Sequence, residues 1–256
     1  MILFASDLDN TLIHSYKRAD EGDICVEVKE GKKLSFMTPE AYKMLGKIFL
    51  REDIIFVPVT TRSLEQYRRI DFFEGIPAEI AVAANGGILI ENGIVNKEWY
   101  EESKEMIKEC IPVFEKGISF LEKDSEVYFE IRVVDELFVF TKSHSPEKTR
   151  DNLAAVLDSE LINVYNIGEK VYIFPRIMSK GFAIKRLCRK YSFEKIICAG
   201  DSEFDIPMLE EADAAYCPDA LVPFISSENV KGFEKTTYPN DFFDVAIGNV
   251  PFGQYK

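Results

Sequence analysis

The chain has 256 residues, of which 46% are hydrophobic, and its 44 acidic and 31 basic residues give a net charge of −13. This acidity argues against nucleic acid as a partner, because phosphate backbones are bound by clustered Lys and Arg. It also argues against anionic membranes. The length exceeds that of a usual single domain, which favours one large α/β domain with a smaller insert.

Cysteine usage and hydropathy indicate the compartment. Five cysteines are scattered and form no CxxC pair, which is typical of reduced thiols in a cytosolic protein. The first residues show no signal-peptide pattern, since Asp7 interrupts their apolar run. No stretch approaches the ~20 apolar residues of a membrane span. We therefore expect a soluble, cytoplasmic protein.

The first predicted element is a buried strand over Ile2–Ser6, which stops at Asp7 and Asp9. Strand side chains alternate between faces, but a chain that curls after its strand can bring both carboxylates toward one point. Two acids there repel each other unless a cation joins them. Such a corner suits Mg²⁺, with one carboxylate as nucleophile and the other as acid/base. The alternative is a strand that ends in an ordinary Asx turn.

Residues 13–36 are rich in charge and glycine and predict a hairpin flap over the end of the first strand. A helix is then expected after Thr38, which has proline at the first helical position behind it. A second buried strand over Ile54–Val59 ends at Thr60, whose hydroxyl and the following backbone N–H groups suit a phosphate. The alternative for Thr60 is an ordinary helix N-cap.

Ser63 and Gln66 form a capping-box candidate directly after Thr60-Thr61-Arg62. A third buried strand over Ile80–Ala84 leads into Asn85-Gly86-Gly87. After this turn the sequence pattern changes to a helix, a hairpin, a second helix and a second hairpin. This order of elements predicts an inserted α+β domain. Its expected elements are a helix over Tyr100–Phe120, a hairpin of Glu126–Val134 with Leu137–Lys142, a helix over Pro146–Asp158, and a hairpin of Leu161–Ile167 with Lys170–Pro175.

Lys180 lies just before the next predicted helix, where positive charge opposes the helix dipole. That placement suggests a bound anion or a carboxylate cluster, and a solvated lysine is the alternative. A fourth buried strand over Lys195–Ala199 ends in Gly200 and offers Asp201 and Asp205, four residues apart on one expected helical face. A capped helix start is the alternative there. From Ala212 onward we expect a closing helix and loops.

Buried strands that alternate with helices predict a Rossmann-like parallel sheet flanked by helices, with the α+β cap domain inserted. The predicted catalytic core covers residues 1–89 and 176–256, and the cap covers residues 90–175. In open sheets of this kind, ligands bind beyond the carboxyl ends of the strands. The candidate site residues that follow the predicted strands lie at such ends.

In their order along the chain and in their residue types, these sites resemble the four motifs of the haloacid dehalogenase (HAD) superfamily of Mg²⁺-dependent phosphohydrolases. The motifs stand here as Asp7-Leu8-Asp9-Asn10-Thr11, Thr60, Lys180, and Gly200-Asp201-x-x-x-Asp205. The large insert resembles the C2-type (IIB or Cof-like) cap, in the subset that includes sucrose-phosphate phosphatase and phosphomannomutase. Asn85-Gly86-Gly87 is similar to the turn at that cap's entrance.

The resemblance implies a role for each motif residue. Asp7 would attack phosphorus, and Asp9 would protonate the leaving group and then deprotonate the hydrolytic water. Thr60 and Lys180 would bind the phosphoryl oxygens. Mg²⁺ would be held by the Asp7 carboxylate, the Asp9 backbone carbonyl and Asp201, while Asp205 would support the metal or orient Lys180. Substrate contacts are expected from Thr61, Arg62, Asn85 and Gly86.

The expected function is therefore hydrolysis of a small phosphorylated metabolite, a sugar or polyol phosphate, through an aspartyl phosphate. A phosphomutase of the same fold and a non-catalytic phosphometabolite-binding protein are the alternatives. The chain departs from the family at Phe204, where relatives often have Asn, and at Thr61, where they often have Gly. The sequence indicates no oligomeric state. Candidates for leaving-group contacts on the cap and its hinge are better interpreted as solvated or packing residues, namely Arg132, Lys142, His144, Lys170, Tyr172 and Arg176.

Overall fold

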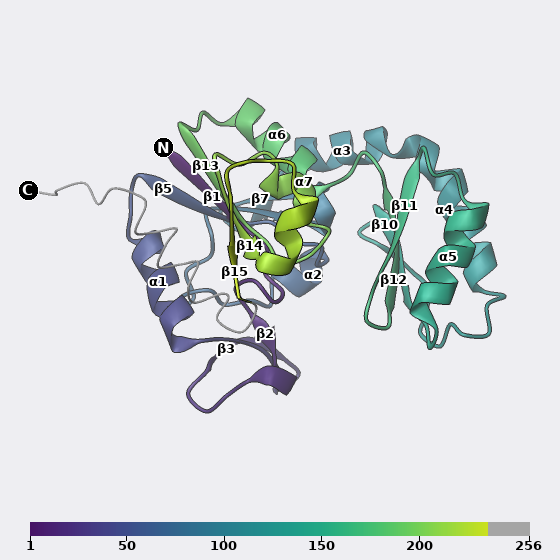
Figure 1. Ribbon diagram of the computed structural model, residues 1–256, viewed down its shortest axis with the longest axis horizontal. Coiled ribbons are helices and arrows are strands. Elements are labelled where there is room, and N and C mark those ends of the chain that lie inside the picture. Colours follow the sequence, from purple (N-terminus) through teal and green to yellow (C-terminus); the bar gives the residue numbers. More distant parts are fainter. Residues whose placement is uncertain (235–256) are drawn as a thin grey trace, which may run out of the picture. The chain divides into compact units, whose positions relative to one another are not determined.

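The computed structural model describes residues 1–234 and divides the chain into two compact units (Figure 1). The first unit is formed by Met1–Val95 together with the chain from Lys180 onward, and the second by Asn96–Ser179. The inserted unit thus begins at Asn96 and ends at Ser179, a few residues after each of the boundaries expected at 90 and 175. Each unit is described by itself below.

The first unit is built on a five-stranded parallel sheet, which confirms the predicted α/β fold class. The apolar run at the start of the chain forms β1, and β13 and β5 flank it as parallel neighbours. The chain therefore extends the sheet on both sides of β1, and in sheets of this kind ligands bind beyond the carboxyl ends of the strands where the strand order reverses. The strand order is β15 (Val230–Phe233), β14 (Ala214–Pro218), β13 (Lys195–Ala199), β1 (Ile2–Ser6) and β5 (Ile54–Pro58).

Helices accompany this sheet, and the local sequence explains where they begin. Thr38 caps α1 (Pro39–Phe49) by accepting from the backbone N–H of Ala41. The capping box of Ser63 and Gln66 is present and starts the short α2 (Leu64–Tyr67). In the described part of this unit, the remaining helices are α6 (Lys180–Lys190), α7 (Ile206–Leu209), and the 3₁₀ turns η1 (Tyr16–Arg18), η2 (Ala84–Gly86) and η4 (Asp219–Phe224).

The third predicted strand is present but pairs differently from its expected place in the parallel sheet. β6 (Ile80–Ala83) forms an antiparallel sheet with β7 (Ile88–Glu91) and β8 (Ile94–Val95). One parallel bridge, between Val59 and Val82, joins it to the end of β5. The tight turn between β6 and β7 explains the change, because it lets β7 fold back at once onto the strand before it.

The expected hairpin flap is a three-stranded antiparallel sheet in the order β2-β4-β3. It consists of β2 (His14–Ser15), β3 (Ile24–Lys29) and β4 (Lys32–Met37). The pairing of β3 with β4 slips on both sides of Glu27, which marks a β-bulge. As a consequence, the adjacent residues Val26 and Glu27 are both buried.

The second unit is a four-stranded antiparallel sheet with helices. Its strands are ordered β11 (Ile162–Ile167), β12 (Lys170–Pro175), β10 (Phe138–Lys142) and β9 (Arg132–Val134). The turn from β9 to β10 uses Asp135 and Glu136, both at positive φ, as expected of a tight hairpin. Tyr172 packs its ring against Phe140 and Phe174, which supports its interpretation as a packing residue.

The single helix expected over Tyr100–Phe120 is wrong. The segment is broken into α3 (Lys97–Met106), the 3₁₀ turn η3 (Lys108–Cys110) and α4 (Ile111–Leu121). Pro112 explains the break, because proline lacks a backbone N–H and clashes with the preceding turn of a continuing helix. The helix α5 (Pro146–Val156) lies close to its expected range.

The closing helix expected after Ala212 is also incorrect within the described residues, where β14, the 3₁₀ turn η4 and β15 add two strands to the parallel sheet. Tyr238-Pro239-Asn240 and Pro251-Phe252-Gly253 lie outside the described residues.

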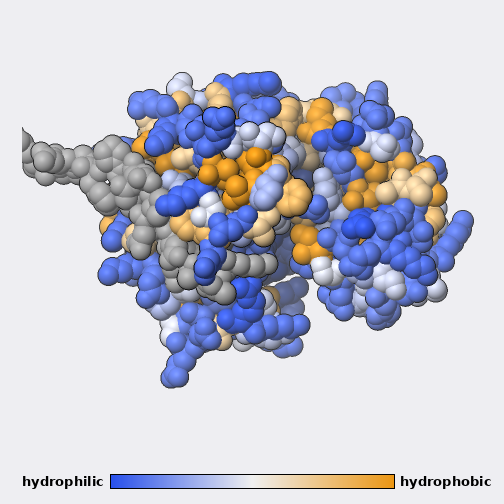
Figure 2. Space-filling model, in the orientation of Figure 1, coloured by the Kyte–Doolittle hydropathy of each residue, from blue (hydrophilic) through white to orange (hydrophobic). Residues whose placement is uncertain are grey.

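Hydrophilic side chains cover much of the face seen in Figure 2, with apolar patches between them. No helix within residues 1–234 combines the length and apolar character that crossing a bilayer requires.

Candidate active site

The candidate site is assembled from loops that leave the carboxyl ends of neighbouring parallel strands. The N–H of Asp7 donates to the carbonyl of Ala199, and the N–H of Val59 donates to the carbonyl of Ser6. These two bonds continue the pairing of β1 with its neighbours one residue beyond the strand ends. The loops that carry Asp7, Thr60 and Asp201 therefore start side by side.

Asp7 is buried and bound to Lys180. The Lys180 ammonium lies 2.6 Å from Oδ1 of Asp7 and 2.5 Å from Oδ1 of Asp205. Lys180 is itself 1% exposed, and as the first residue of α6 it is held at the helix N-terminus. The carboxylate cluster that its unfavourable helix position suggested is therefore present, and the solvated-lysine alternative is wrong.

Asp205 organises the loop after β13. Its Oδ2 accepts hydrogen bonds from the backbone N–H groups of Asp201 and Ser202 and from the Ser202 hydroxyl. The expected helical face shared by Asp201 and Asp205 is thus incorrect, because the chain between them is a loop and Asp205 stands at the N-terminus of α7. A Cβ at Gly200 would lie 2.3 Å from Cβ of Asp205, so only glycine lets this loop close.

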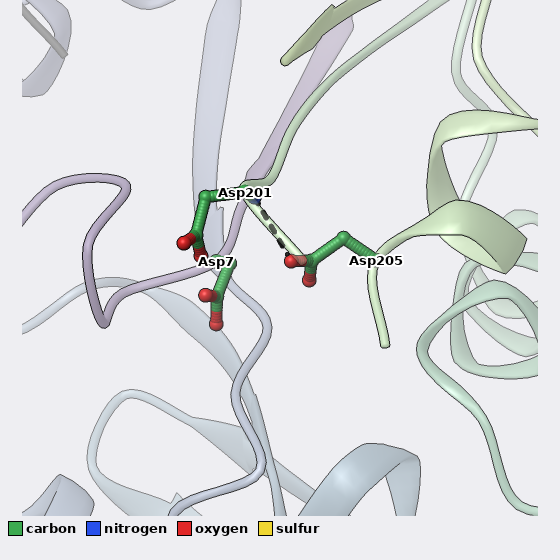
Figure 3. Close-up of side chains that lie close together, drawn as sticks. All are labelled: Asp7, Asp201 and Asp205. Carbon is green, nitrogen blue, oxygen red and sulfur yellow. Dashed lines mark hydrogen bonds between the residues drawn. The ribbon is translucent and has the colours of Figure 1, made fainter. Parts of the chain in front are cut away.

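The Asp7, Asp201 and Asp205 side chains gather at one point, as Figure 3 shows for the three carboxylates. One carboxylate oxygen from each lies within 4.8 Å of the others. Burial and the neighbouring carboxylates raise the pKa of Asp7 well above its usual range, against the opposing effect of Lys180. Burial alone would lower the pKa of Lys180, but Asp205 and Asp7 raise it above its ordinary value.

The charges at this point do not balance without a cation. When ionised, three carboxylates face a single ammonium, which leaves an excess of two negative charges. Oxygen donors with that excess fit a hard divalent cation such as Mg²⁺. Asp205 uses both oxygens on protein donors, so Asp7 and Asp201 are the side chains better placed to reach a metal.

The Asp9 side chain is not part of the carboxylate cluster formed by Asp7, Asp201 and Asp205. Its side chain is half exposed and receives a two-pronged pair of hydrogen bonds from Arg62: Nε donates to Oδ2 and Nη2 to Oδ1, each over 2.8 Å. Between the two acids, Leu8 is buried, and three backbone N–H groups, those of Thr11, Leu12 and Ile13, turn back to its carbonyl. The loop therefore sends Asp7 and Asp9 to different partners.

The remaining predicted residues surround the end of β5. Thr60 is fully buried, and its Oγ1 accepts from the N–H of Arg62 over 3.1 Å. Within residues 1–234 the Thr60 hydroxyl proton has no acceptor, so this group retains a donor. Thr60 is not the N-cap of α2, because Ser63 holds that position.

Asn85 and Gly86 are brought next to Thr60 by a strained turn. The N–H of Asn85 donates to the Thr60 carbonyl, and Ala84, Asn85 and Gly86 all have positive φ. Consecutive left-handed residues are costly and tend to cluster at functional sites. Thr61 is half-buried beside Arg62 in the same loop.

Three polar residues at this site were missed by sequence reasoning: Glu27, Ser35 and Arg69. The carboxylate of Glu27 is 3% exposed and accepts from Arg62, Arg69 and Ser35. Glu27 comes from a hairpin segment whose many charges concealed it. An acidic residue between two valines, Val26 and Val28, was the available signal.

The family follows from a comparison with known protein families. The family model of haloacid dehalogenase-like hydrolases matches residues 70–218, more than half of the chain. The chain belongs to the haloacid dehalogenase-like hydrolase family. Lys180, Asp201 and Asp205 lie inside the matched range, whereas Asp7, Asp9 and Thr60 precede it. The comparison with curated proteins gave no match.

Solved structures share the fold of this hydrolase over nearly their whole length. The sucrose-phosphatase of Synechocystis sp. PCC6803, in complex with sucrose and phosphate, is 12% identical with a TM-score of 0.63, covering 96% of this chain and 97% of that one. A haloacid dehalogenase-like hydrolase from B. subtilis is 16% identical with a TM-score of 0.61, covering 95% and 99%. The C-terminal domain of C. albicans trehalose-6-phosphate phosphatase is 13% identical with a TM-score of 0.60, covering 97% and 93%.

Proposed function

We propose that this hydrolase is a Mg²⁺-dependent phosphomonoesterase that acts on a small phosphorylated metabolite through an aspartyl phosphate. The observation that carries the proposal is the buried contact between Asp7 and Lys180 inside a group of carboxylates. A nucleophilic carboxylate needs a fixed orientation, and the phosphoryl group needs positive charge close by. Asp7 and Lys180 together meet both needs.

In the first half of the reaction, Asp7 acts as the nucleophile. Lys180 binds its Oδ1, so Oδ2 is the oxygen that attacks phosphorus. The bond between phosphorus and the ester oxygen breaks, and the departing alkoxide takes a proton from Asp9. Lys180 and the Thr60 hydroxyl bind the phosphoryl oxygens, where negative charge concentrates in the transition state.

In the second half, water hydrolyses the aspartyl phosphate. Asp9, now a carboxylate, accepts a proton from the water as its oxygen attacks phosphorus. The bond from phosphorus to the Asp7 oxygen breaks, inorganic phosphate leaves, and both carboxylates return to their starting state. Asp205 acts as a positioning residue, since it binds Lys180 and the backbone of the Asp201 loop.

The metal would be held by the Asp7 carboxylate, Asp201 and the Asp9 backbone carbonyl. When bound, it supplies positive charge to the phosphoryl oxygens and offsets the repulsion among the carboxylates. Thr11 supports this arrangement from the protein side, because its hydroxyl lies 3.5 Å from Oδ1 of Asp201.

A sugar or polyol phosphate is the substrate class we propose. Two of the similar structures are phosphatases named for sugar phosphates, one crystallised with sucrose and phosphate. Thr61, Asn85 and Gly86 line the loops beside Thr60 and are the residues of this unit that we expect to contact substrate. The net charge of −13 agrees with a small-molecule substrate in place of a polyanionic one.

The test is release of inorganic phosphate from p-nitrophenyl phosphate and from a panel of sugar and polyol phosphates. We expect Mg²⁺-dependent release that EDTA stops and added Mg²⁺ restores. Hydrolysis that persists in EDTA contradicts the metal dependence. Conversion of a hexose phosphate into its isomer without phosphate release identifies the phosphomutase alternative, and binding without either reaction identifies the non-catalytic one.

Mg²⁺ binding has a readout besides activity. A ligand that binds only the folded state stabilises it by RT ln(1 + [L]/Kd). Mg²⁺ should therefore raise the midpoint of thermal unfolding of the wild type, and this rise should be much smaller for Asp201→Asn. Equal rises in both proteins contradict the role of Asp201.

A further inference from the structure

In the flap hairpin, the charged side chain of Glu27 is buried while the apolar side chain of its neighbour Val28 is exposed. Strict alternation along Val26-Glu27-Val28 places both valines on the core face and Glu27 toward solvent. The bulge reverses this after Val26, so that Glu27 is 3% exposed and Val28 is 50% exposed. Burying a charge and exposing an apolar side chain both cost stability. Local rules broken in this way are expected at functional sites.

The buried carboxylate is fully engaged with basic and hydroxyl donors. Arg62 donates to its Oε2 over 2.8 Å, Arg69 donates to its Oε1 over 3.0 Å, and the Ser35 hydroxyl donates to Oε2 over 2.6 Å. Burial alone would raise the pKa of Glu27, but Arg62, Ser35 and Arg69 hold it below its ordinary value. Glu27 is therefore a fixed anion that anchors two arginines.

Arg62 passes this anchoring on to Asp9. One edge of its guanidinium binds Glu27 and Ser35, and the other edge makes the fork to Asp9. Four of its N–H···O contacts thus go to protein partners, which is most of the donor capacity of the guanidinium. Arg62 is planar and rigid, so holding one edge fixes the direction of the other.

We propose that Glu27 is a positioning residue that acts through Arg62 to orient the carboxylate of Asp9 for its exchange of protons with substrate and water. The inference rests on the proposed function, because it takes the role of Asp9 from there. It also assigns Arg62 to the orientation of Asp9, whereas the sequence suggested a substrate contact. Asp9 needs such an anchor, since its side chain is half exposed on a loop.

The leaving group provides the sharpest test of this role. The alkoxide that leaves from an alkyl phosphate is a strong base and needs a proton from Asp9 as it departs. The p-nitrophenolate that leaves from p-nitrophenyl phosphate is a weak base and departs without a proton. The ratio of kcat/KM for glycerol phosphate to that for p-nitrophenyl phosphate therefore reports on proton delivery in the first chemical half-reaction. General-acid catalysis contributes ~100- to 10,000-fold, so a misplaced acid should lower the ratio by roughly tenfold or more.

The test variant is Glu27→Gln, which keeps the shape of the side chain and removes its charge. We expect its kcat/KM ratio to fall by roughly tenfold or more, while kcat/KM for p-nitrophenyl phosphate changes less than about threefold. Partial unfolding lowers both substrates equally and leaves the ratio unchanged. Ser35→Ala, which removes one donor to Glu27 and one acceptor from Arg62, should shift the ratio in the same direction and serves if Glu27→Gln does not fold.

The matched control is Glu65→Gln. Glu65 is exposed and pairs with Nη1 of Arg69, whereas Nε of Arg69 binds Glu27, and substitution of Glu65 should leave the ratio unchanged. An unchanged or raised ratio in folded Glu27→Gln overturns the inference. If the wild type releases no phosphate, or Asp7→Asn retains its activity, the proposed function fails first. If both of those controls behave as expected, a failure belongs to Glu27 alone.

Discussion

The ammonium of Lys180 lies 2.6 Å from a carboxylate oxygen of Asp7, although 173 positions separate the two residues in the chain. The contact joins the end of the first strand to the start of a helix that follows the whole inserted unit. It is the point where charge, burial and the proposed chemistry meet. The first two predictions follow from it.

Asp7→Asn should abolish phosphate release without unfolding the protein. The amide has no anionic oxygen to attack phosphorus, so we expect a loss of at least about 1,000-fold, or about 4 kcal/mol in activation free energy. Because burial raises the pKa of Asp7, its ionised form is unfavourable in the metal-free fold. The thermal midpoint of metal-free Asp7→Asn should therefore equal or exceed that of the wild type. Activity within about tenfold of wild type contradicts the nucleophile.

Lys180→Met should destabilise the protein by about 3–5 kcal/mol, because it leaves buried carboxylates without their cation. Denaturant unfolding of the metal-free protein measures this loss. A second substitution, Asp205→Asn, should recover part of it, since it removes one of the charges that Lys180 neutralises. The control is Lys185→Met on the same helix, whose pair with Glu211 is partly exposed and should matter by about 1 kcal/mol or less. Equal effects at both lysines would refute the prediction.

Gly200→Ala should disturb the site through the packing of Asp205. The new Cβ would lie 2.3 Å from Cβ of Asp205, which is fully buried and cannot swing aside. Overpacking of this kind costs about 1–3 kcal/mol, and activity should fall because Asp205 holds Lys180. Gly93→Ala serves as the comparison: it has positive φ but open space around it, so it should cost stability and leave activity unchanged. Full activity in Gly200→Ala would count against Asp205 as a positioning residue.

The stability that Glu27 contributes should depend on pH in the acid range. Its native pKa lies below the ordinary value, so its contribution is present above about pH 4.3, the ordinary pKa of Glu. The contribution is lost as pH falls through the native pKa. The difference in unfolding free energy between wild type and Glu27→Gln should therefore be constant near neutrality and shrink below about pH 4.3. A difference that grows toward acid would have the wrong sign for this network.

Much of the fold could be predicted because buried parallel strands are encoded locally. Short apolar runs that end in small or polar residues can be recognised as buried strands from the sequence alone, as in Ile2–Ser6 and Lys195–Ala199. The pairing of β6 was not encoded in this way, since a buried run looks the same in a parallel and an antiparallel sheet. β14 was missed because its alanines and proline are residues that strands seldom use, and β15 because Lys231 and Gly232 interrupt its apolar residues.

The positions of Asp7 and Thr60 could be predicted because each follows the end of a buried strand, and that of Lys180 because it starts a helix where positive charge is unfavourable. The site could not be predicted where the position depends on pairing between distant segments. The burial of Glu27 depends on a bulge, which sequence alternation contradicts. The loop from Asp201 to Asp205 was mistaken for a helix because a spacing of four suits both, and hydrogen bonds to Asp205 decide between them.

The bulge at Glu27 also makes the length of the flap hairpin matter. Surface hairpins usually tolerate insertions and deletions, because their register has little consequence. Here the pairing of β3 with β4 has the same register before and after Glu27, because one extra residue in β3 is matched by one extra residue in β4. A one-residue deletion in either strand alone would shift the pairing on one side of Glu27, and such a shift moves side chains to the opposite face. An unchanged flap length is therefore a condition for the contact between Glu27 and Arg62.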